Sequence, residues 1–192
     1  MRLRAPNGEG ETVHAYCLFC ETRKCQSVAD QIKIRLGHES YSPTIIQRKW
    51  VKGVAQEVPH NWLPGYVFVY TEEPVLPRFR VDGVIRCLGN DELSGNDLDF
   101  ARMIYDKKGV VDTIRLVEEG DRCRVADPAW KGMSGTVVKL DRGRKRCCVE
   151  FHFDDTQWRV WIGYDLVERE AETHGADGNG RQAPSQEDRK QH

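Results

Sequence analysis

The sequence has no apolar run long enough for a membrane helix and no excess of charge of either sign. No stretch approaches the roughly 20 consecutive apolar residues that span a bilayer, and the basic start, MRLRAPNGEGETVH, has no apolar core of signal-peptide length after it. The formal net charge of -1 at pH 7 argues against a uniformly basic nucleic-acid coat. We therefore expect a cytoplasmic protein without membrane contact, in which any contact with nucleic acid is local.

Catalytic motifs are also missing from the sequence. His38, His60 and His152 are far apart and lie in dissimilar contexts, and there is neither a GxSxG segment nor a phosphate-binding loop. Asp154 and Asp155 are better explained as a turn between two strands. We therefore expect no enzymatic activity and no cofactor.

The seven cysteines do not have the spacing of a metal or redox site. Cys17 and Cys20 are three residues apart on an expected strand, so their side chains point to opposite faces. Cys25 falls on the apolar stripe of the next expected element, a helix, and no second CxxC or HxxxH segment follows. Because cytoplasmic thiols stay reduced, we expect core thiols here and no metal.

The first half of the chain alternates strand and helix patterns. A helix is expected over 22–37, with Thr22 suited to cap it and Gly37 to end it; its apolar stripe is Cys25, Val28, Ala29, Ile32 and Leu36. The other expected elements are strands over 13–20, 63–70 and 84–89, a hairpin over 44–51 and 53–58, and helices over 74–81 and 96–108. This order predicts an α+β sandwich of the split βαβ kind.

From Val110 onward the pattern changes to strands only. Strands are expected over 121–127, 135–141, 146–153 and 156–162, joined by Gly-rich and charged turns, which predicts a small all-β barrel. The two domains then cover 12–108 and 118–170, with a linker over 109–117. Residues 1–11 and 171–192 are poor in apolar side chains, and we expect them to be disordered tails.

Two segments carry a family resemblance. They are NWLPGYVFVY at 61–70 and EEGDRCRVADPAWKGMSGTVVKLDRGRKRCCVEF at 118–151. They resemble the NusG family of transcription elongation factors, whose N-terminal domain carries a PGYV strand and whose C-terminal KOW barrel carries a GD-x-V-x-V-x-x-G-x-x-x-G-x-V segment. The resemblance covers about residues 13 to 169. It implies a ferredoxin-like α/β sandwich (NGN domain) followed by an SH3-like KOW barrel.

The resemblance also implies RNA polymerase as the partner. In the family, the NGN domain docks an apolar groove on the clamp helices of the largest polymerase subunit. The positions that match are Tyr16, Leu63, Pro64 and Tyr66. Aromatic anchors often dominate such patches, but Tyr16 and Tyr66 are also open to a core interpretation, since aromatic residues on strands are mostly buried. Leu63 lies on the expected turn, and we expect it outside the core.

The hairpin arm TIIQRKWVKG is basic at its tip. It holds Arg48, Lys49 and Lys52. The family's corresponding hairpin lies close to upstream DNA, so contact with DNA phosphates is one interpretation. A solvated hairpin tip without a ligand is the other.

The expected barrel carries basic and aromatic side chains that are suited to nucleic acid. Val160 and Ile162 fit inward positions, which leaves Arg159 and Trp161 outward as a stacking platform for an unpaired base. The candidate contacts are Trp130, Lys131, Arg142, Arg144, Lys145, Arg146, Arg159 and Trp161. A solvated, charged turn is the alternative.

The opening YCLFCETRKC resembles the specialised LoaP branch of the family, whose KOW domain binds an RNA hairpin. This resemblance implies a monomeric antitermination factor that rides on RNA polymerase and recognises nascent RNA. Two other functions stay open. One is a housekeeping NusG-type factor whose barrel binds a termination factor or a ribosomal protein. The other is a ribosome-associated KOW protein, which would leave the PGYV domain without a role.

Overall fold

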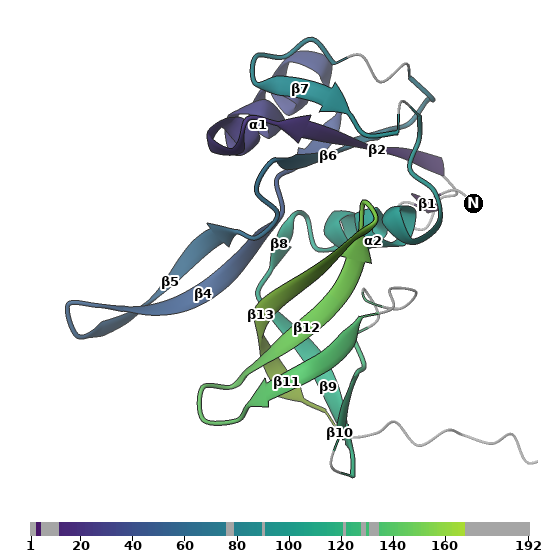
Figure 1. Ribbon diagram of the computed structural model, residues 1–192. Coiled ribbons are helices and arrows are strands. Elements are labelled where there is room, and N and C mark those ends of the chain that lie inside the picture. Colours follow the sequence, from purple (N-terminus) through teal and green to yellow (C-terminus); the bar gives the residue numbers. More distant parts are fainter. Residues whose placement is uncertain are drawn as a thin grey trace, which may run out of the picture.

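The computed structural model describes residues 3–4, 12–75, 79–89, 91–120, 122–127, 130 and 135–167. Figure 1 shows two parts: a first sheet with one helix on its far side, and a curled second sheet below it, with the other helix between the two. The α+β class predicted from the sequence is therefore observed. No helix in the described ranges is long and apolar enough to cross a membrane.

The first sheet is antiparallel throughout. It contains β1 (Leu3–Arg4), β2 (Thr12–Cys20), β3 (Glu39–Tyr41), β6 (Tyr66–Thr71) and β7 (Val84–Cys87). Its order is β1-β2-β6-β3, and β7 pairs with β2. Leu3 and Arg4 were expected within a disordered tail, but they pair with β2; the rest of both expected tails lies outside the described residues.

One face of this sheet is covered by helix α1 (Cys25–Leu36), which follows a short 3-10 turn at Thr22–Lys24. The prediction that Thr22 caps α1 is wrong, because Thr22 lies in that turn and makes no side-chain cap. Gly37 ends α1 with a φ of 70°, as expected. Leu36 is 44% exposed, so the apolar stripe stops one turn earlier, at Ile32.

The opposite face of the sheet packs against α2 (Gly95–Asp106) and the second sheet. α2 buries Leu98, Phe100, Ala101, Met103 and Ile104. The short helix expected over 74–81 does not form at residues 74–75 or 79–81; residues 76–78 lie outside the described ranges.

A hairpin arm extends from the first part (Figure 1). It consists of β4 (Thr44–Val51) and β5 (Val54–Asn61), and β4 also runs parallel to β8 (Val110–Val111). The arm turns through Lys52 and Gly53, which have φ values of 51° and 80°. Positive φ at both central positions is the geometry that a two-residue hairpin turn requires.

The second sheet has the order β10-β9-β13-β12-β11. Its strands are β9 (Thr113–Glu119), β10 (Arg122–Val125), β11 (Thr136–Asp141), β12 (Arg146–Phe153) and β13 (Thr156–Leu166). The sheet curls so that its edge strands β10 and β11 approach each other. The stretch 109–117, expected as a linker, contributes β8 and most of β9; the domain boundaries themselves remain a prediction.

Both sheets share one hydrophobic core. The larger cluster of buried side chains runs from Ala15, Cys17 and Phe68 in the first sheet through Phe100 in α2 to Val149 and Phe151 in the second. A smaller cluster lies between α1 and the first sheet. The second sheet is therefore packed against the first part over a continuous apolar contact.

Candidate protein and nucleic-acid binding surfaces

Aromatic rings from both parts meet in a contact that we call the aromatic seam. It consists of Trp62, Tyr66, Phe68 and Phe100 on one side and Phe151, Phe153 and Trp158 on the other. The ring centroids of Tyr66 and Phe153 lie 5.4 Å apart, and those of Phe100 and Phe151 are stacked at 5.1 Å. Such pairs add to the stabilisation by area burial alone, so the seam holds the curled sheet on the first sheet.

A polar contact closes one end of the seam. The Tyr66 hydroxyl donates to Asp154 Oδ2 at 3.1 Å, and the Asp154 backbone N–H donates to Asp97 Oδ1 at 3.1 Å. Asp154 and Asp155 form the β12–β13 turn with φ values of 50° and 53°, as the sequence predicted for a turn. The contact therefore fixes a tight turn of the second sheet against β6 and α2.

Burial shifts the titration of the groups in this contact. It raises the pKa of Tyr66 to about 12, and the negative Asp154 adds to the rise. Burial also raises the pKa of Asp97, partly offset by the N–H donated from Asp154. Tyr66 is therefore a neutral donor at physiological pH, as its hydrogen bond to Asp154 requires.

The structure brings together three of the four residues expected to face polymerase. Leu63 is fully buried, Tyr66 is 9% exposed and Pro64 is exposed beside them. Tyr16 lies on the opposite face of the sheet: it is 2% exposed, packs with the α1 cluster and contacts Phe79. The core interpretation thus fits Tyr16, and it fits Tyr66 as long as the seam is closed. Leu63, expected outside the core because it lies on a turn, is instead fully buried in the larger core cluster.

Two residues beside this group were missed in the sequence. Phe19 pairs in register with Tyr66 on one side and with Arg86 on the other. The Arg86 guanidinium lies 5.6 Å from the centre of the Phe19 ring. Only strand register reveals this neighbourhood, because Phe19 is 47 residues from Tyr66 and 67 residues from Arg86 in the sequence.

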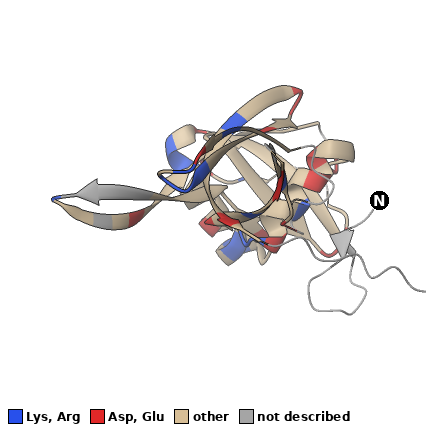
Figure 2. Ribbon diagram, turned by 90° about the horizontal axis from the view of Figure 1, so that it is seen from below, with Lys and Arg blue, Asp and Glu red and all other residues tan. Residues whose placement is uncertain are grey.

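The basic turn of the second sheet is largely paired with carboxylates. Arg142 Nη2 lies 3.2 Å from Glu118 Oε1. Arg146 Nε lies 3.2 Å from Asp141 Oδ2, and Arg159 Nε on β13 lies 2.7 Å from Glu150 Oε2. Arg144 also lies 3.8 Å from Asp141. Figure 2 shows basic and acidic segments together around the curled sheet seen end-on. These exposed pairs stabilise little, but they reduce the local positive charge.

Lys145 differs from its neighbours. It is exposed, its φ is 48°, and no ion pair to it occurs among the described residues. It stands at the tip of the turn between β11 and β12. Among the predicted basic contacts of the second sheet whose side chains the structure describes, Lys145 is thus the charge that is freest to meet a phosphate.

Trp161 and Trp130 have different environments. Trp161 is half-buried on the outer face, with the Arg146 guanidinium 4.7 Å from its ring centre, while Val160 and Ile162 are buried as predicted. Trp130 was expected on an exposed loop, but it is 3% exposed, because its ring fills the space beside Gly135. Lys131 lies outside the described residues, as do the side chains of Arg48 and Lys49; Lys52 is exposed at the tip of the arm.

The cysteines are free thiols inside the cores. Cys17, Cys20, Cys25, Cys147 and Cys148 are buried. Burial raises the pKa of Cys20 and of Cys147 to about 12. No group of three His, Cys, Asp or Glu side chains within the described ranges is placed to hold a metal ion. The expectation of core thiols is confirmed for the CLFCETRKC segment.

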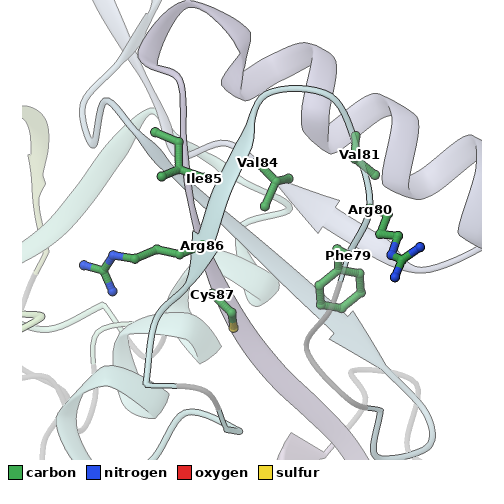
Figure 3. Close-up of a pocket in the computed structure, with 7 residues that line it drawn as sticks. All are labelled: Phe79, Arg80, Val81, Val84, Ile85, Arg86 and Cys87. Atoms are coloured by element: carbon green, nitrogen blue, oxygen red, sulfur yellow. The ribbon is translucent and has the colours of Figure 1, made fainter.

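A shallow hollow of about 460 Å³ lies beside strand β7. It is lined by Phe79, Arg80, Val81, Val84, Ile85, Arg86 and Cys87. Figure 3 shows Arg80 and Arg86 extending to opposite sides of β7, with Phe79 and Val81 on the side of Arg80. The two arginines therefore belong to different surfaces, although they are close in sequence.

No protein-family model matches the chain, and no curated protein matches it. Among solved structures, the chain is similar to NusG of Thermotoga maritima, in a structure that concerns domain interaction in that protein. The two share 15% sequence identity, with 79% of this chain and 93% of that chain covered and a TM-score of 0.48. A likeness of this degree says nothing about the partners or the activity of this chain.

Proposed function

We propose that the chain is a NusG-type transcription elongation factor that binds RNA polymerase through its first part and nucleic acid through its second. One observation carries the proposal. The LPGYVFVY segment supplies the central strand β6 and gathers Leu63, Pro64 and Tyr66 at one corner of the sheet. The resemblance assigns this same segment to the polymerase contact.

The strand order supports an NGN domain in the first part. Strands β7-β2-β6-β3 pair antiparallel in that order, and α1 connects β2 to β3. This is the arrangement of a ferredoxin-like sandwich, which we assign to residues 12–108. The curled five-stranded sheet supports a KOW barrel in the second part.

The seam sets a condition on polymerase binding. Tyr66 is buried against Phe153 and Trp158, and Leu63 is fully buried in the same core cluster. A partner can therefore reach these side chains only in a form of the molecule in which the second sheet has left the first. A polymerase that binds these side chains in the open form shifts the population towards that form, because the closed form does not offer them.

The second part offers the nucleic-acid contact. We assign it to Lys145 at the turn tip, to the flanking arginines and to the half-buried Trp161 with Arg146 above its ring. A nascent RNA hairpin is the proposed ligand, and antitermination the proposed outcome. The four arginine–carboxylate pairs favour a second candidate, in which the barrel binds a termination factor or a ribosomal protein instead.

Binding to purified bacterial RNA polymerase core tests the polymerase contact. Three proteins are compared: wild type, Trp158→Ala and Pro64→Glu. Trp158→Ala removes one ring contact with Tyr66. If the seam loses about 1.5 kcal/mol, the population of the form with the second sheet released rises roughly tenfold. The affinity for polymerase should rise by a similar factor. Pro64→Glu places a charge on the exposed corner and should weaken binding.

Circular dichroism must show that both variants are folded. Absence of binding by wild type and by Trp158→Ala alike would refute the proposed polymerase contact. Trp158→Ala binding more weakly than wild type would show that the second sheet forms part of the contact instead of covering it.

A salt series with a hairpin RNA tests the second contact. The double variant Arg144→Ala, Lys145→Asn removes two charges; Asn is chosen because it tolerates the positive φ of Lys145 better than Ala. A matched control, Arg23→Ala with Lys33→Ala, removes two exposed charges near α1. Loss of affinity and of salt slope in the first variant alone supports RNA as the ligand; equal behaviour of the two favours the protein-partner candidate.

A further inference from the structure

Part of the corner around Tyr66 stays open while the seam is closed. Three side chains form this open corner: Phe19, Pro64 and Arg86. Pro64 and Arg86 are exposed and Phe19 is half-buried. The ring centroids of Phe19 and Tyr66 are 5.6 Å apart, in an edge-to-face arrangement. The open corner is therefore continuous with a side chain that the seam covers.

The open corner belongs to a row of side chains across the first sheet, and only one end of that row is covered. Arg86 on β7, Phe19 on β2 and Tyr66 on β6 are successive Cα partners, so they form one row across the sheet. Phe153 and Trp158 pack on Tyr66 at the β6 end. The second sheet thus covers the row at Tyr66 and leaves it accessible at Phe19 and Arg86.

The open end of the row has a definite chemistry. No carboxylate within the described ranges lies within 4.0 Å of the Arg86 guanidinium, whereas Arg142, Arg144, Arg146 and Arg159 all have one. Arg86 instead lies over the Phe19 ring, which keeps its charge at a fixed place beside an apolar surface. A matching ligand carries a carboxylate next to an apolar side chain.

Backbone geometry holds the corner in place. Gly65 has a φ of 97°, and a Cβ at this position would lie 3.0 Å from the Phe19 ring. The Gly65 carbonyl accepts the Cys20 backbone N–H at 2.7 Å. The turn that presents Pro64 is thereby fixed against Phe19, so the three side chains form a preformed surface.

We propose that Phe19, Pro64 and Arg86 form the site of first contact with RNA polymerase, and that an acidic, partly apolar polymerase surface binds there before the second sheet leaves Tyr66. This inference rests on the proposed function. It divides polymerase binding into two steps: an electrostatically steered contact with the closed molecule, then replacement of the second sheet along the same row.

Association kinetics with RNA polymerase core test the inference. The variant is Arg86→Glu, and the control is Arg80→Glu, which makes the same charge change on the other side of β7 (Figure 3). We expect Arg86→Glu to lower kon about three- to tenfold at low salt, with a smaller effect at high salt and little change in koff. Arg80→Glu should leave kon close to the wild-type value.

The possible outcomes separate this inference from the proposed function. If wild type binds but Arg86→Glu has the same kon as wild type, the first-contact site is refuted and the polymerase contact stands. The same holds if Arg80→Glu lowers kon as much as Arg86→Glu does. Absence of binding by wild type and Trp158→Ala refutes both. If Arg86→Glu instead weakens only the binding of a single-stranded oligonucleotide, the corner is a nucleic-acid site and the inference is wrong.

Discussion

The Tyr66 hydroxyl gives a sharp test of how the two parts are held together. Tyr66→Phe removes only the oxygen that donates to Asp154, while the ring keeps its contacts with Phe19, Phe153 and Trp158. The variant therefore separates the polar contact from the aromatic one. We expect it to be folded and less stable than wild type.

The expected loss follows from the chemistry of the pair. A hydrogen bond to a charged group contributes about 1.5–3 kcal/mol, and the low end or less applies where the freed carboxylate can be hydrated. Asp154 is only half-buried, so water can reach it once the hydroxyl is gone. We therefore expect Tyr66→Phe to lower the free energy of unfolding by about 1 kcal/mol near pH 8.

The pH dependence has a defined sign. The pKa of Tyr66 is raised to about 12 in the folded protein, above the value near 10 of an unfolded chain. The neutral hydroxyl is thus favoured by folding, and its contribution is complete below about pH 10 and disappears as the pH rises towards 12. The stability gap between wild type and Tyr66→Phe should shrink above about pH 10 and change sign as the pH nears 12, because ionising the buried Tyr66 destabilises wild type and the variant has no group to ionise.

Urea unfolding at a series of alkaline pH values measures this gap. Tyr41→Phe serves as control, because the Tyr41 hydroxyl donates to Glu39 within the first part. Backbone relaxation by NMR then reports whether the two parts tumble together: Tyr66→Phe should loosen them and Tyr41→Phe should not. Equal tumbling in all three proteins, with no stability gap between wild type and Tyr66→Phe near pH 8, would refute the proposed role of this hydrogen bond.

Three further predictions concern other parts of the molecule. Asp97→Asn keeps an acceptor for the Asp154 N–H and removes a carboxylate whose pKa is raised, mainly by burial and also by Asp154 and Asp155. Because a raised pKa means that stability is lost as the pH increases above about 4, the variant should be more stable than wild type at pH 7 but not at about pH 3. An equal difference in stability at both pH values would contradict this. Gly109→Ala should destabilise by about 2 kcal/mol or more, measured by thermal unfolding, since Gly109 has a φ of 79° and the added Cβ would lie 2.8 Å from Tyr41 Cβ. Cys17, Cys20 and Cys147 should react slowly with a thiol reagent at about pH 8 in the native protein and fast in urea, since burial raises the pKa of each thiol. If all three thiols react fast in the native protein, they lie outside the core.

The regular elements could be read from the sequence because their signals are local. Apolar spacing located α1 and α2, β-branched runs located β6 and β12, and Gly37 ended α1. The alternation that placed Val160 and Ile162 inside and Arg159 outside also holds, because one face of β13 lies on the core. Cys17 and Cys20 lie on opposite faces of β2, as the same alternation predicts, and both are buried because both faces of the first sheet are covered.

The candidate site could be predicted only in part, because its environment comes from distant segments. Nothing near Tyr66 in the sequence shows that Phe153 and Trp158 will cover it. The acidic partners of Arg142 and Arg159 lie on neighbouring strands, so a basic run in the sequence overstated the exposed charge. Trp130 was misjudged for the same reason, and the sequence left both interpretations of Tyr16 open, because strand pairing and packing decide on which side a ring lies.

In the aromatic seam, each part of the molecule covers an apolar surface of the other. Opening it frees two apolar surfaces at once, one on the first sheet and one on the second, and each aromatic ring exposes up to about 150–250 Å². A molecule that binds either freed surface shifts the same equilibrium, so it must favour a ligand of the other by an equal factor. Two partners that never touch would in this way bind cooperatively to a single chain, and each would make the chain responsive to the presence of the other.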